Sequence, residues 1–280
     1  MAALVGAEFD SISEIYDSTR RAATEAELRA VSRELGECRT VLDVGVGTGR
    51  FAKPLSDLGF VIVGVDLSPK MMLRAKSKGV QNLILADAHK MPFRDKSFDA
   101  SIIIHVLYLI PDWRDIAREM GRVTEDKVAA LLARRQREWN NNPNASVPQP
   151  PAPPPLQELW TRYAQLREEM GYPIRRTIRM WQNEDEIRSE FPPMKLVKVS
   201  DELVVLSISD LMTRFRQRSY PMQQDIPSGV YEKIMQKLVS YIEDNSRMGK
   251  WSASTLQDRK IERRMVEELA IWRPDLLRQT

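Results

Sequence analysis

The sequence predicts an α/β fold built on a seven-stranded, mostly parallel sheet whose last strands form an antiparallel hairpin, with a helical cap inserted. Two observations carry this prediction. Short runs rich in Val, Ile and Leu alternate with helical patterns through the first half of the chain, and these runs show little period-two alternation. Parallel strands covered by helices on both faces are typically encoded in this way.

Five apolar runs are the expected parallel strands, and helical patterns separate them. Two of those patterns close on a glycine, a common helix stop. The expected strands cover residues 40–44, 61–66, 82–87, 100–105 and 127–133. The expected helices between them cover residues 49–59, 68–79 and 113–123.

The second half of the chain begins with a change of composition. Residues 140–155, "NNNPNASVPQPPAPPP", are rich in proline and lack apolar periodicity, which is typical of an exposed, stiff connector. We expect an antiparallel hairpin over residues 195–209, turning near residues 200–202. The helices expected around the hairpin cover residues 156–171, 183–191, 211–220, 229–245 and 253–272.

These patterns divide the chain into five parts. We expect residues 156–243 to cover the carboxyl ends of the strands and to select a substrate. The parts are a core with an N-terminal flap helix (1–139), a proline-rich linker (140–155), a helical cap insertion (156–194), the last strands of the core sheet (195–209) and C-terminal helices (210–280).

The overall composition is that of an ordinary globular chain. It has 280 residues, a net charge of +3 and one cysteine, Cys38, so an intrachain disulfide is excluded. A charge balance this close to neutral does not favour nucleic acid as a partner. The start "MAALVGAEFD" lacks a signal-peptide pattern, and the apolar stretch 102–110 is far shorter than the roughly 20 residues of a membrane span. We expect a cytoplasmic protein without membrane association, as a monomer or a homodimer.

The stretch "VLDVGVGTGR" places three glycines directly after the first expected strand. Gly45, Gly47 and Gly49 allow the backbone to approach a ligand closely, and the helix that follows begins with unpaired amides. A dinucleotide fingerprint would have a third glycine where Arg50 stands, and a Walker-type lysine is absent from the turn. The turn therefore favours a nucleoside ligand over a triphosphate.

Three aspartates support a cationic nucleoside as that ligand. Asp66 closes the second strand, where a carboxylate can accept both ribose hydroxyls. Asp87 closes the third strand, where an acid can accept from an adenine amino group. Asp43 lies inside the first strand, and burial of a lone charge is costly, so we expect it to bond the turn backbone or an ammonium group.

Several motifs together resemble the class I S-adenosylmethionine (SAM) methyltransferases, which have a Rossmann-like fold. They are "VLDVGVGTGRF", "VIVGVDLSPKMM", "LADAHKMPFRDKSFD" and "HVLYLIPDWRDIAREMGRV", and "FDSISEIYDSTR" is similar to the N-terminal segment of the subgroup that methylates small molecules. The resemblance is strong over residues 9–133 and looser over 195–240. One departure is "VTEDKVA", where the family usually has a proline-glycine-glycine turn.

The resemblance implies SAM as cofactor and a role for each matching residue. Asp43 and the three glycines would form the loop for the methionine part of SAM. Tyr16 and Arg20 would lie across the cofactor as a flap, and His105 would end the fourth strand facing the sulfonium. The ribose and adenine would be held by Asp66, Leu67, Met71, Asp87 and Ala88.

The implied reaction is in-line methyl transfer to an O, N or C nucleophile of a small-molecule acceptor. His105 is the candidate general base and Tyr108 a candidate for the catalytic pocket. The spacing of His, Cys and acidic residues offers no metal-ligand motif, so no metal is expected. Two alternatives remain open, a methyltransferase acting on RNA or protein and a non-enzymatic SAM-binding scaffold protein.

Overall fold

The computed structural model separates the chain into two compact units, each described here by itself. The first unit comprises residues 1–135, 178–201 and 265–280, and the second comprises residues 136–177 and 202–264. The residues that the structure describes are 6, 9–110, 112–135, 155–174, 182–206, 208–251 and 261–278.

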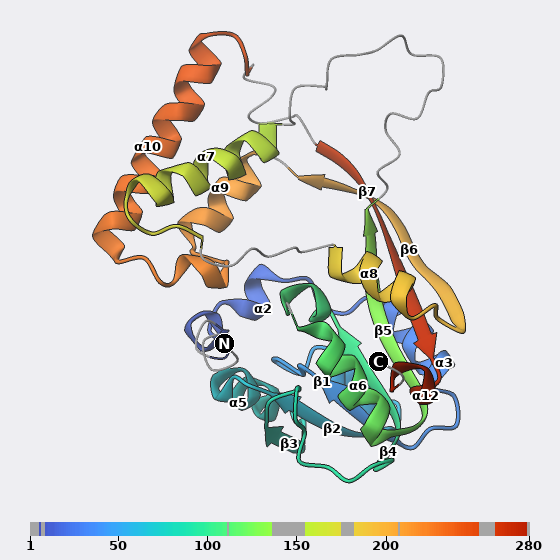
Figure 1. The fold of residues 1–280 in the computed structure, drawn as a ribbon. Coiled ribbons are helices and arrows are strands. Elements are labelled where there is room, and N and C mark those ends of the chain that lie inside the picture. The colour runs from blue at the N-terminus through green and yellow to red at the C-terminus, as the bar shows by residue number, and fades with distance from the viewer. Residues whose placement is uncertain are drawn as a thin grey trace, which may run out of the picture. The chain divides into compact units, whose positions relative to one another are not determined.

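A seven-stranded sheet, which lies mostly within the first unit, has the strand order β3-β2-β1-β4-β5-β7-β6 (Figure 1). Strands β1 to β5 run parallel to one another, and β7 runs antiparallel to β5, with Ala130 opposite Ala270. The strands are β1 (Thr40–Val44), β2 (Val61–Asp66), β3 (Asn82–Leu85), β4 (Phe98–Ile104), β5 (Thr124–Arg135), β6 (Lys195–Leu206) and β7 (Ile261–Trp272). This arrangement confirms the predicted fold class.

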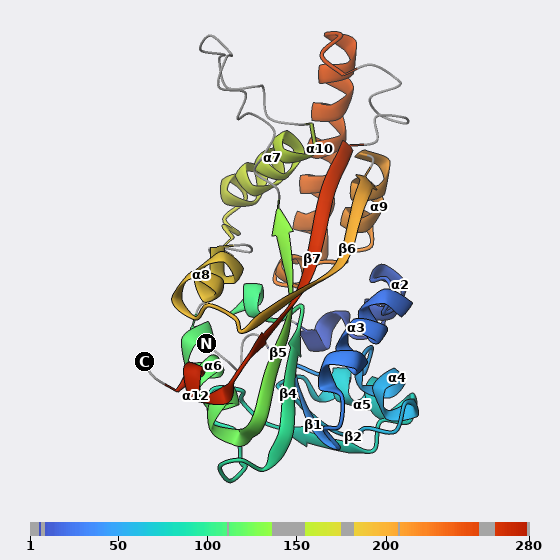
Figure 2. The same cartoon turned by 90° about the vertical axis from the view of Figure 1, so that its right-hand side faces the viewer.

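Helices cover both faces of this sheet (Figure 2). One face packs against α3 (Glu25–Leu35), α4 (Ala52–Asp57) and α5 (Pro69–Ser77). The opposite face packs against α6 (Trp113–Val123), α8 (Gln182–Glu190) and α12 (Pro274–Leu277). Because both faces are covered, the central strands carry apolar residues at nearly every position, as the uninterrupted runs in the sequence predicted.

The two faces of the sheet have separate apolar cores. Val41, Ile102 and Leu131 belong to the core under α3 and α4, and all three are almost fully buried. On the other face Trp113 meets the ring of Phe191 edge-on at 6.0 Å. The indole of Trp272 donates to the Phe191 carbonyl at 2.7 Å, which satisfies the polar atom of a buried tryptophan.

The second unit is helical and has its own core. Its helices are α7 (Pro155–Glu169), α9 (Ile208–Arg216) and α10 (Ser228–Arg247), with the short η2 (Pro221–Gln223). The rings of Tyr163 and Phe215 stack at 4.6 Å in its centre. Arg167, 1% exposed, donates to the Tyr172 carbonyl and to Asp225, so its buried charge is compensated. No helix in the described part of the chain is long and apolar enough to cross a membrane.

The five predicted parallel strands are confirmed, two of them to the residue. β1 and β2 have the expected bounds, and the other three shift at their ends by a few residues. The unusual segment before β5 needs no separate turn, because α6 ends at Val123 and β5 begins at Thr124. The Thr124 hydroxyl donates to Ser101 on β4 at 2.8 Å, which fixes this start.

Two predictions for the C-terminal third give the wrong secondary structure. Residues 195–206 form the single strand β6 instead of a hairpin, and residues 261–272 form β7 instead of the end of a helix. Leu269 and Trp272 have the spacing of one helical face, but they pack on opposite faces of the sheet. A strand covered on both sides is apolar on both, so a few of its residues imitate helical spacing.

The predicted domain boundaries also need correction. Helix α8 belongs to the first unit, where Arg114 of α6 binds Glu190 at 2.6 Å, so residues 156–194 are not one insertion. The stretch 210–280 is not all helical, since it contains β7. The proline-rich linker lies outside the described residues apart from Pro155, which begins α7.

We expect Leu42→Ala to lower the free energy of unfolding by about 2–5 kcal/mol, because Leu42 is fully buried in β1 and its loss leaves a cavity. Leu73→Ala is the matched control, since Leu73 on α5 is 65% exposed and its truncation should change stability by less than about 0.5 kcal/mol. Urea unfolding followed by circular dichroism measures both. Equal losses would contradict the packing described for β1.

Candidate functional site

The turn after β1 folds back sharply and is held by the neighbouring strand. The amides of Gly45 and Val46 both donate to the Val65 carbonyl of β2, at 2.9 and 3.0 Å. Gly45, Gly47 and Gly49 have φ of 75°, 54° and 75°, the left-handed region that favours glycine. The glycines are therefore required by the backbone, as the sequence predicted.

The three glycines differ in what surrounds them. A Cβ on Gly45 would lie 2.6 Å from Val106, and one on Gly49 would lie 2.8 Å from Val80, so both are needed for close packing. A Cβ on Gly47 would meet nothing nearer than a backbone oxygen at 4.0 Å. Gly47 therefore faces open space at the carboxyl end of β1, where open α/β sheets bind ligands.

Asp66 ends β2 and ties this turn to the next helix. Its Oδ2 accepts from the Gly47 amide at 2.7 Å, and its Oδ1 accepts from the Ser68 amide at 2.9 Å. Burial raises the pKa of Asp66, although the amides of Ser68 and Gly47 act against the rise. The carboxylate predicted to bind a ribose is thus fixed at the edge of the glycine turn.

Asp43 lies within β1 and is 4% exposed. Burial raises its pKa to about 7, the Asp66 carboxylate adds to the rise, and Arg50 opposes it. The Gly45, Val46 and Gly47 amides are bonded to Val65 and Asp66, not to Asp43. The ammonium group of a ligand, the other partner expected for Asp43, stays a prediction.

Asp87 lies just beyond β3, with half-buried Ala88 next to it on the apolar core. The Asp87 Oδ1 accepts from the His89 amide at 2.9 Å and lies 2.6 Å from His89 Nδ1. Burial raises the pKa of Asp87, but the bonds from His89 outweigh burial and lower it. An ionised acid thus stands at the position predicted for the adenine.

The N-terminal segment, predicted to form a flap, is bonded to the glycine turn. Thr48 donates its hydroxyl to Asp17 at 2.6 Å, and Asp17 also binds Lys78 at 2.6 Å. In this segment, which includes α2 (Tyr16–Thr19), the guanidinium of Arg20 lies over the ring of Tyr16 at 5.4 Å. The sequence analysis named Tyr16 and Arg20 but missed Asp17.

The two apolar residues predicted beside the ribose have different environments. Leu67 follows β2 and is half-buried, and its carbonyl oxygen would lie 2.6 Å from a Cβ placed on Gly6. Met71 on α5 is 1% exposed, and its amide donates to the Ser68 hydroxyl oxygen at 3.1 Å, which caps the helix. Leu67 thus contacts the N-terminal segment, while Met71 supports the site from the core.

His105 follows β4 at the same edge of the sheet. Its φ of 57° is uncommon for a residue with a side chain, and such strain concentrates at functional sites. Its Nε2 lies 3.6 Å from Glu27 and 3.9 Å from Glu267, two buried acids that the sequence analysis missed. Tyr108 lies in the short helix η1 (Leu107–Leu109), and its side chain is outside the described residues.

No local signal in the sequence pointed to Glu27 or Glu267. "TEAE" at residues 24–27 is a capping box, in which Thr24 caps the Glu27 amide and Glu27 caps the Thr24 amide, so it predicts a helix start. The contact with Glu267 joins residues separated by most of the chain. The two acids and His105 come together through the order of the strands.

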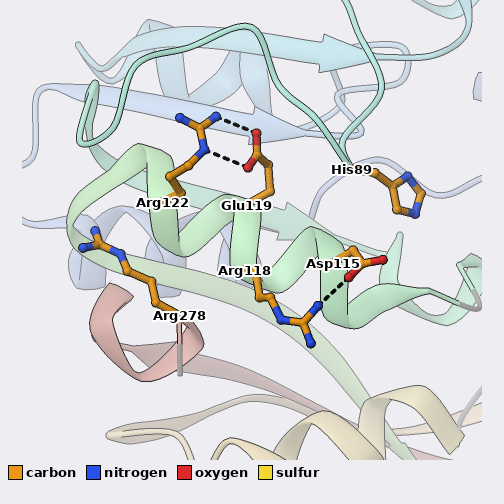
Figure 3. A pocket seen from close by; sticks show the side chains of 6 residues that line it. All are labelled: His89, Asp115, Arg118, Glu119, Arg122 and Arg278. Atoms are coloured by element: carbon orange, nitrogen blue, oxygen red, sulfur yellow. Dashed lines mark hydrogen bonds and ion pairs between the residues drawn. The ribbon is translucent and has the colours of Figure 1, made fainter. Parts of the chain in front are cut away.

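A polar hollow lies along α6, away from the glycine turn, and has a volume of about 430 Å³ (Figure 3). Its acids and arginines pair with one another, Arg122 with Glu119 and Arg118 with Asp115, each at 2.5 Å. The hollow is lined by His89, Asp115, Arg118, Glu119, Arg122 and Arg278. None of these six is among the predicted cofactor residues, so we place the candidate site at the glycine turn.

Comparison with known proteins points to the same part of the chain. Residues 42–131 match the methyltransferase domain family. An uncharacterised protein of Methanocaldococcus jannaschii is 34% identical over 118 residues, which cover 41% of this chain and 55% of that protein. A demethylmenaquinone methyltransferase of Renibacterium salmoninarum is 32% identical over 128 residues, 43% of this chain and 54% of the enzyme. The chain spans about half the length of the curated relatives it matches.

The fold extends the likeness beyond the matched residues. A solved structure of a putative methyltransferase from an antibiotic biosynthesis pathway of Anabaena variabilis superimposes with a TM-score of 0.51. The match covers 88% of this chain and 98% of that one at 16% identity, which is a likeness of fold. Residues 42–131 thus match the methyltransferase domain family, and the likeness of the chain as a whole is one of fold.

We expect Asp43→Asn to reduce the pH dependence of stability. Since the native pKa is about 7 and the ordinary value is 3.8, the native state still holds a proton that the unfolded chain has released between about pH 4 and 7. The free energy of unfolding therefore falls as the pH rises through this window. In Asp43→Asn, the difference in this energy between pH 5 and pH 8 should shrink by about 2–3 kcal/mol.

Denaturant unfolding at the two pH values measures this difference. Asp57→Asn is the control, because Asp57 on α4 is 61% exposed and should leave the wild-type pH dependence in place. The same pH dependence in Asp43→Asn and wild type would show that Asp43 ionises normally in the folded chain.

Proposed function

We propose that the chain is a SAM-dependent methyltransferase that transfers a methyl group to an O, N or C nucleophile of a small-molecule acceptor. The observation that carries the proposal is the open glycine turn fastened to Asp66. The turn places a side-chain-free backbone at Gly47 beside a fixed carboxylate, at the carboxyl ends of adjacent parallel strands. The match of residues 42–131 to the methyltransferase domain family supports it.

The residues at this edge fit SAM in shape and charge. Gly47 leaves room for the backbone to lie against a ligand, and Asp66 offers carboxylate oxygens to the ribose hydroxyls. Asp43, whose charge is costly when buried alone, would be ionised beside the ammonium group of the methionine part. Asp87 and Ala88 would border the adenine, with Leu67 and Met71 next to the ribose and Tyr16 and Arg20 as the flap.

The chain's own contribution to the reaction is placement. SAM, when bound, supplies a methyl group already activated by a sulfonium. The glycine turn and Asp66 would hold the donor while the acceptor is held in line with it, which removes most of the entropy cost of a bimolecular step. The N-terminal segment, tied to the turn through Asp17 and Thr48, would keep water away from the donor.

A small molecule is the acceptor class that the relatives favour. Several of the matched proteins are demethylmenaquinone methyltransferases, and the net charge of +3 gives no strong attraction for polynucleotides. Arg218, one of three arginines between residues 214 and 218, donates to the carbonyls of Gln223 and Ile226, so it serves the structure of the second unit.

We expect Asp66→Asn to weaken the binding of both SAM and S-adenosylhomocysteine by about 10- to 150-fold. The substitution keeps the size of the side chain and removes a charged acceptor, and hydrogen bonds to charged groups contribute about 1.5–3 kcal/mol. Isothermal titration calorimetry of wild type and variant measures this change. Exposed Asp57→Asn is the control and should bind as the wild type does.

Two results would count against the proposal in different ways. A folded wild type that binds neither compound would remove SAM as the cofactor. A wild type that binds SAM tightly but labels no small molecule of a cell extract with radioactive methyl groups would favour the non-enzymatic scaffold.

A further inference from the structure

A buried network of acids and an arginine surrounds His105. Glu27 on α3 has no side-chain exposure, and Glu267 on β7 has 4%. Arg21 donates from Nη1 to Glu27 at 2.8 Å and from Nη2 to both oxygens of Glu267 at 2.8 Å. Ser200 on β6 donates to Glu267 at 3.0 Å. Groups from α3, β6 and β7 thus meet in one polar cluster next to His105, which follows β4.

The two carboxylates determine which nitrogen of His105 is basic. Nε2 lies 3.6 Å from Glu27 Oε1 and 3.9 Å from Glu267 Oε1. Carboxylate oxygens only accept hydrogen bonds, so the ring nitrogen that faces them carries the hydrogen. A neutral imidazole has one N–H, and Nδ1 therefore keeps the lone pair.

The charges of the network are balanced while His105 is neutral. Glu27 and Glu267 face Arg21 directly, and Arg50 of the glycine turn lies 3.8 Å from Glu27. Burial would raise the pKa of Glu27, but bonds from His105, the Thr24 amide and Arg21 lower it to about 2. Glu27 can therefore face an imidazolium without a change in its own protonation.

The network adjoins the glycine turn. Val106, the residue after His105, fills the space beside Gly45, where a Cβ would lie 2.6 Å from its methyl group. Arg50, which belongs to the turn, lies 3.8 Å from the same Glu27 oxygen that His105 Nε2 approaches. His105 thus stands between the proposed cofactor cradle and two buried acids.

We propose that Glu27 and Glu267 are positioning residues that make His105 the proton acceptor of the methyl transfer, an inference that rests on the proposed function. The acceptor's O–H or N–H bond breaks, its electron pair stays on the acceptor atom, and the proton bonds to Nδ1 of His105. That electron pair forms the new bond to the methyl group, and the electrons of the broken methyl–sulfur bond stay on sulfur. The two carboxylates stabilise the resulting imidazolium.

The same three side chains have the donor set of a divalent cation site, since their ligand atoms lie within 4.8 Å of one another. Arg21 argues against a cation, because its guanidinium already binds both carboxylates. A metal ion would have to displace four hydrogen bonds from Arg21. The observed contacts therefore favour a proton-holding network.

The test follows the His105 ring and the cofactor separately. The chain has two histidines, so ¹⁵N NMR of the labelled protein gives two sets of ring signals, and His89→Gln assigns them. The variants are Glu27→Gln and Glu267→Gln, two independent changes in case one fails to fold. Glu25→Gln is the matched control, since Glu25 lies on the same helix and is 78% exposed.

We expect the neutral His105 ring of the wild type to carry its hydrogen on Nε2. In Glu27→Gln and in Glu267→Gln the pH midpoint of the His105 signals should fall by about one pH unit, because one facing negative charge is lost. Glu25→Gln should leave it in place, and the His89 midpoint should not move in any of these variants.

Calorimetry with SAM and S-adenosylhomocysteine then relates the ring to the donor. Below the His105 midpoint, the affinity for SAM relative to S-adenosylhomocysteine should fall by about tenfold, because an imidazolium repels the sulfonium but not the neutral thioether. This fall should move to lower pH in both Glu→Gln variants, together with the NMR midpoint. A merely structural ion pair would shift the NMR midpoint and leave the affinity ratio unchanged.

Three outcomes would overturn the inference. The first is a His105 midpoint that does not shift in folded Glu→Gln variants, and the second is an affinity ratio that does not follow the midpoint. The third is broadening of the His105 signals by micromolar Mn²⁺, because it would indicate a metal site. Failure of the wild type to bind either compound would remove the proposed function itself. Binding without coupling to His105 would leave that function standing and remove the inference alone.

Discussion

The turn after β1 is the constraint on which the site depends. Its path requires positive φ at three glycines, and it is held by two amides on the Val65 carbonyl and a third on Asp66. These bonds join β1 to β2 at their carboxyl ends. Because Val106 packs against Gly45, the same turn also fixes where the chain leaves β4 and so where His105 stands. One backbone feature thus aligns groups from three strands.

The site gathers buried charges, and its physical chemistry follows from how each is compensated. Glu27 is bonded by Arg21 and by its own helix cap, and remains ionised. Asp43 has Asp66 as a near neighbour, and burial raises its pKa to about 7. Burial of the Asp43 carboxyl group costs stability, and a cation bound beside it would favour its ionised form. A buried acid with a raised pKa, such as Asp43, is therefore a better indicator of a functional site than the paired charges on the surface.

The sequence predicted the first five strands well because each is a continuous local run bounded by glycine or by a polar residue. It predicted the C-terminal third less well. β7 is buried on both faces, so Leu269 and Trp272 on opposite sides of the sheet imitate a helical stripe. Its partner strand, β5, lies more than a hundred residues earlier in the chain. Neither segment carries a local pattern that identifies the other as its partner.

The sequence by itself determined the parallel core, the glycine turn, the acid that ends β2 and the acid just beyond β3, because these depend on local backbone conformation and on residues next to a strand end. Only the tertiary structure decided that Glu27 and Glu267 face His105, and that Asp17 fastens the N-terminal segment to Thr48. Ion pairs between distant residues require the strand order to be fixed first. No periodicity or spacing along the chain encodes that order.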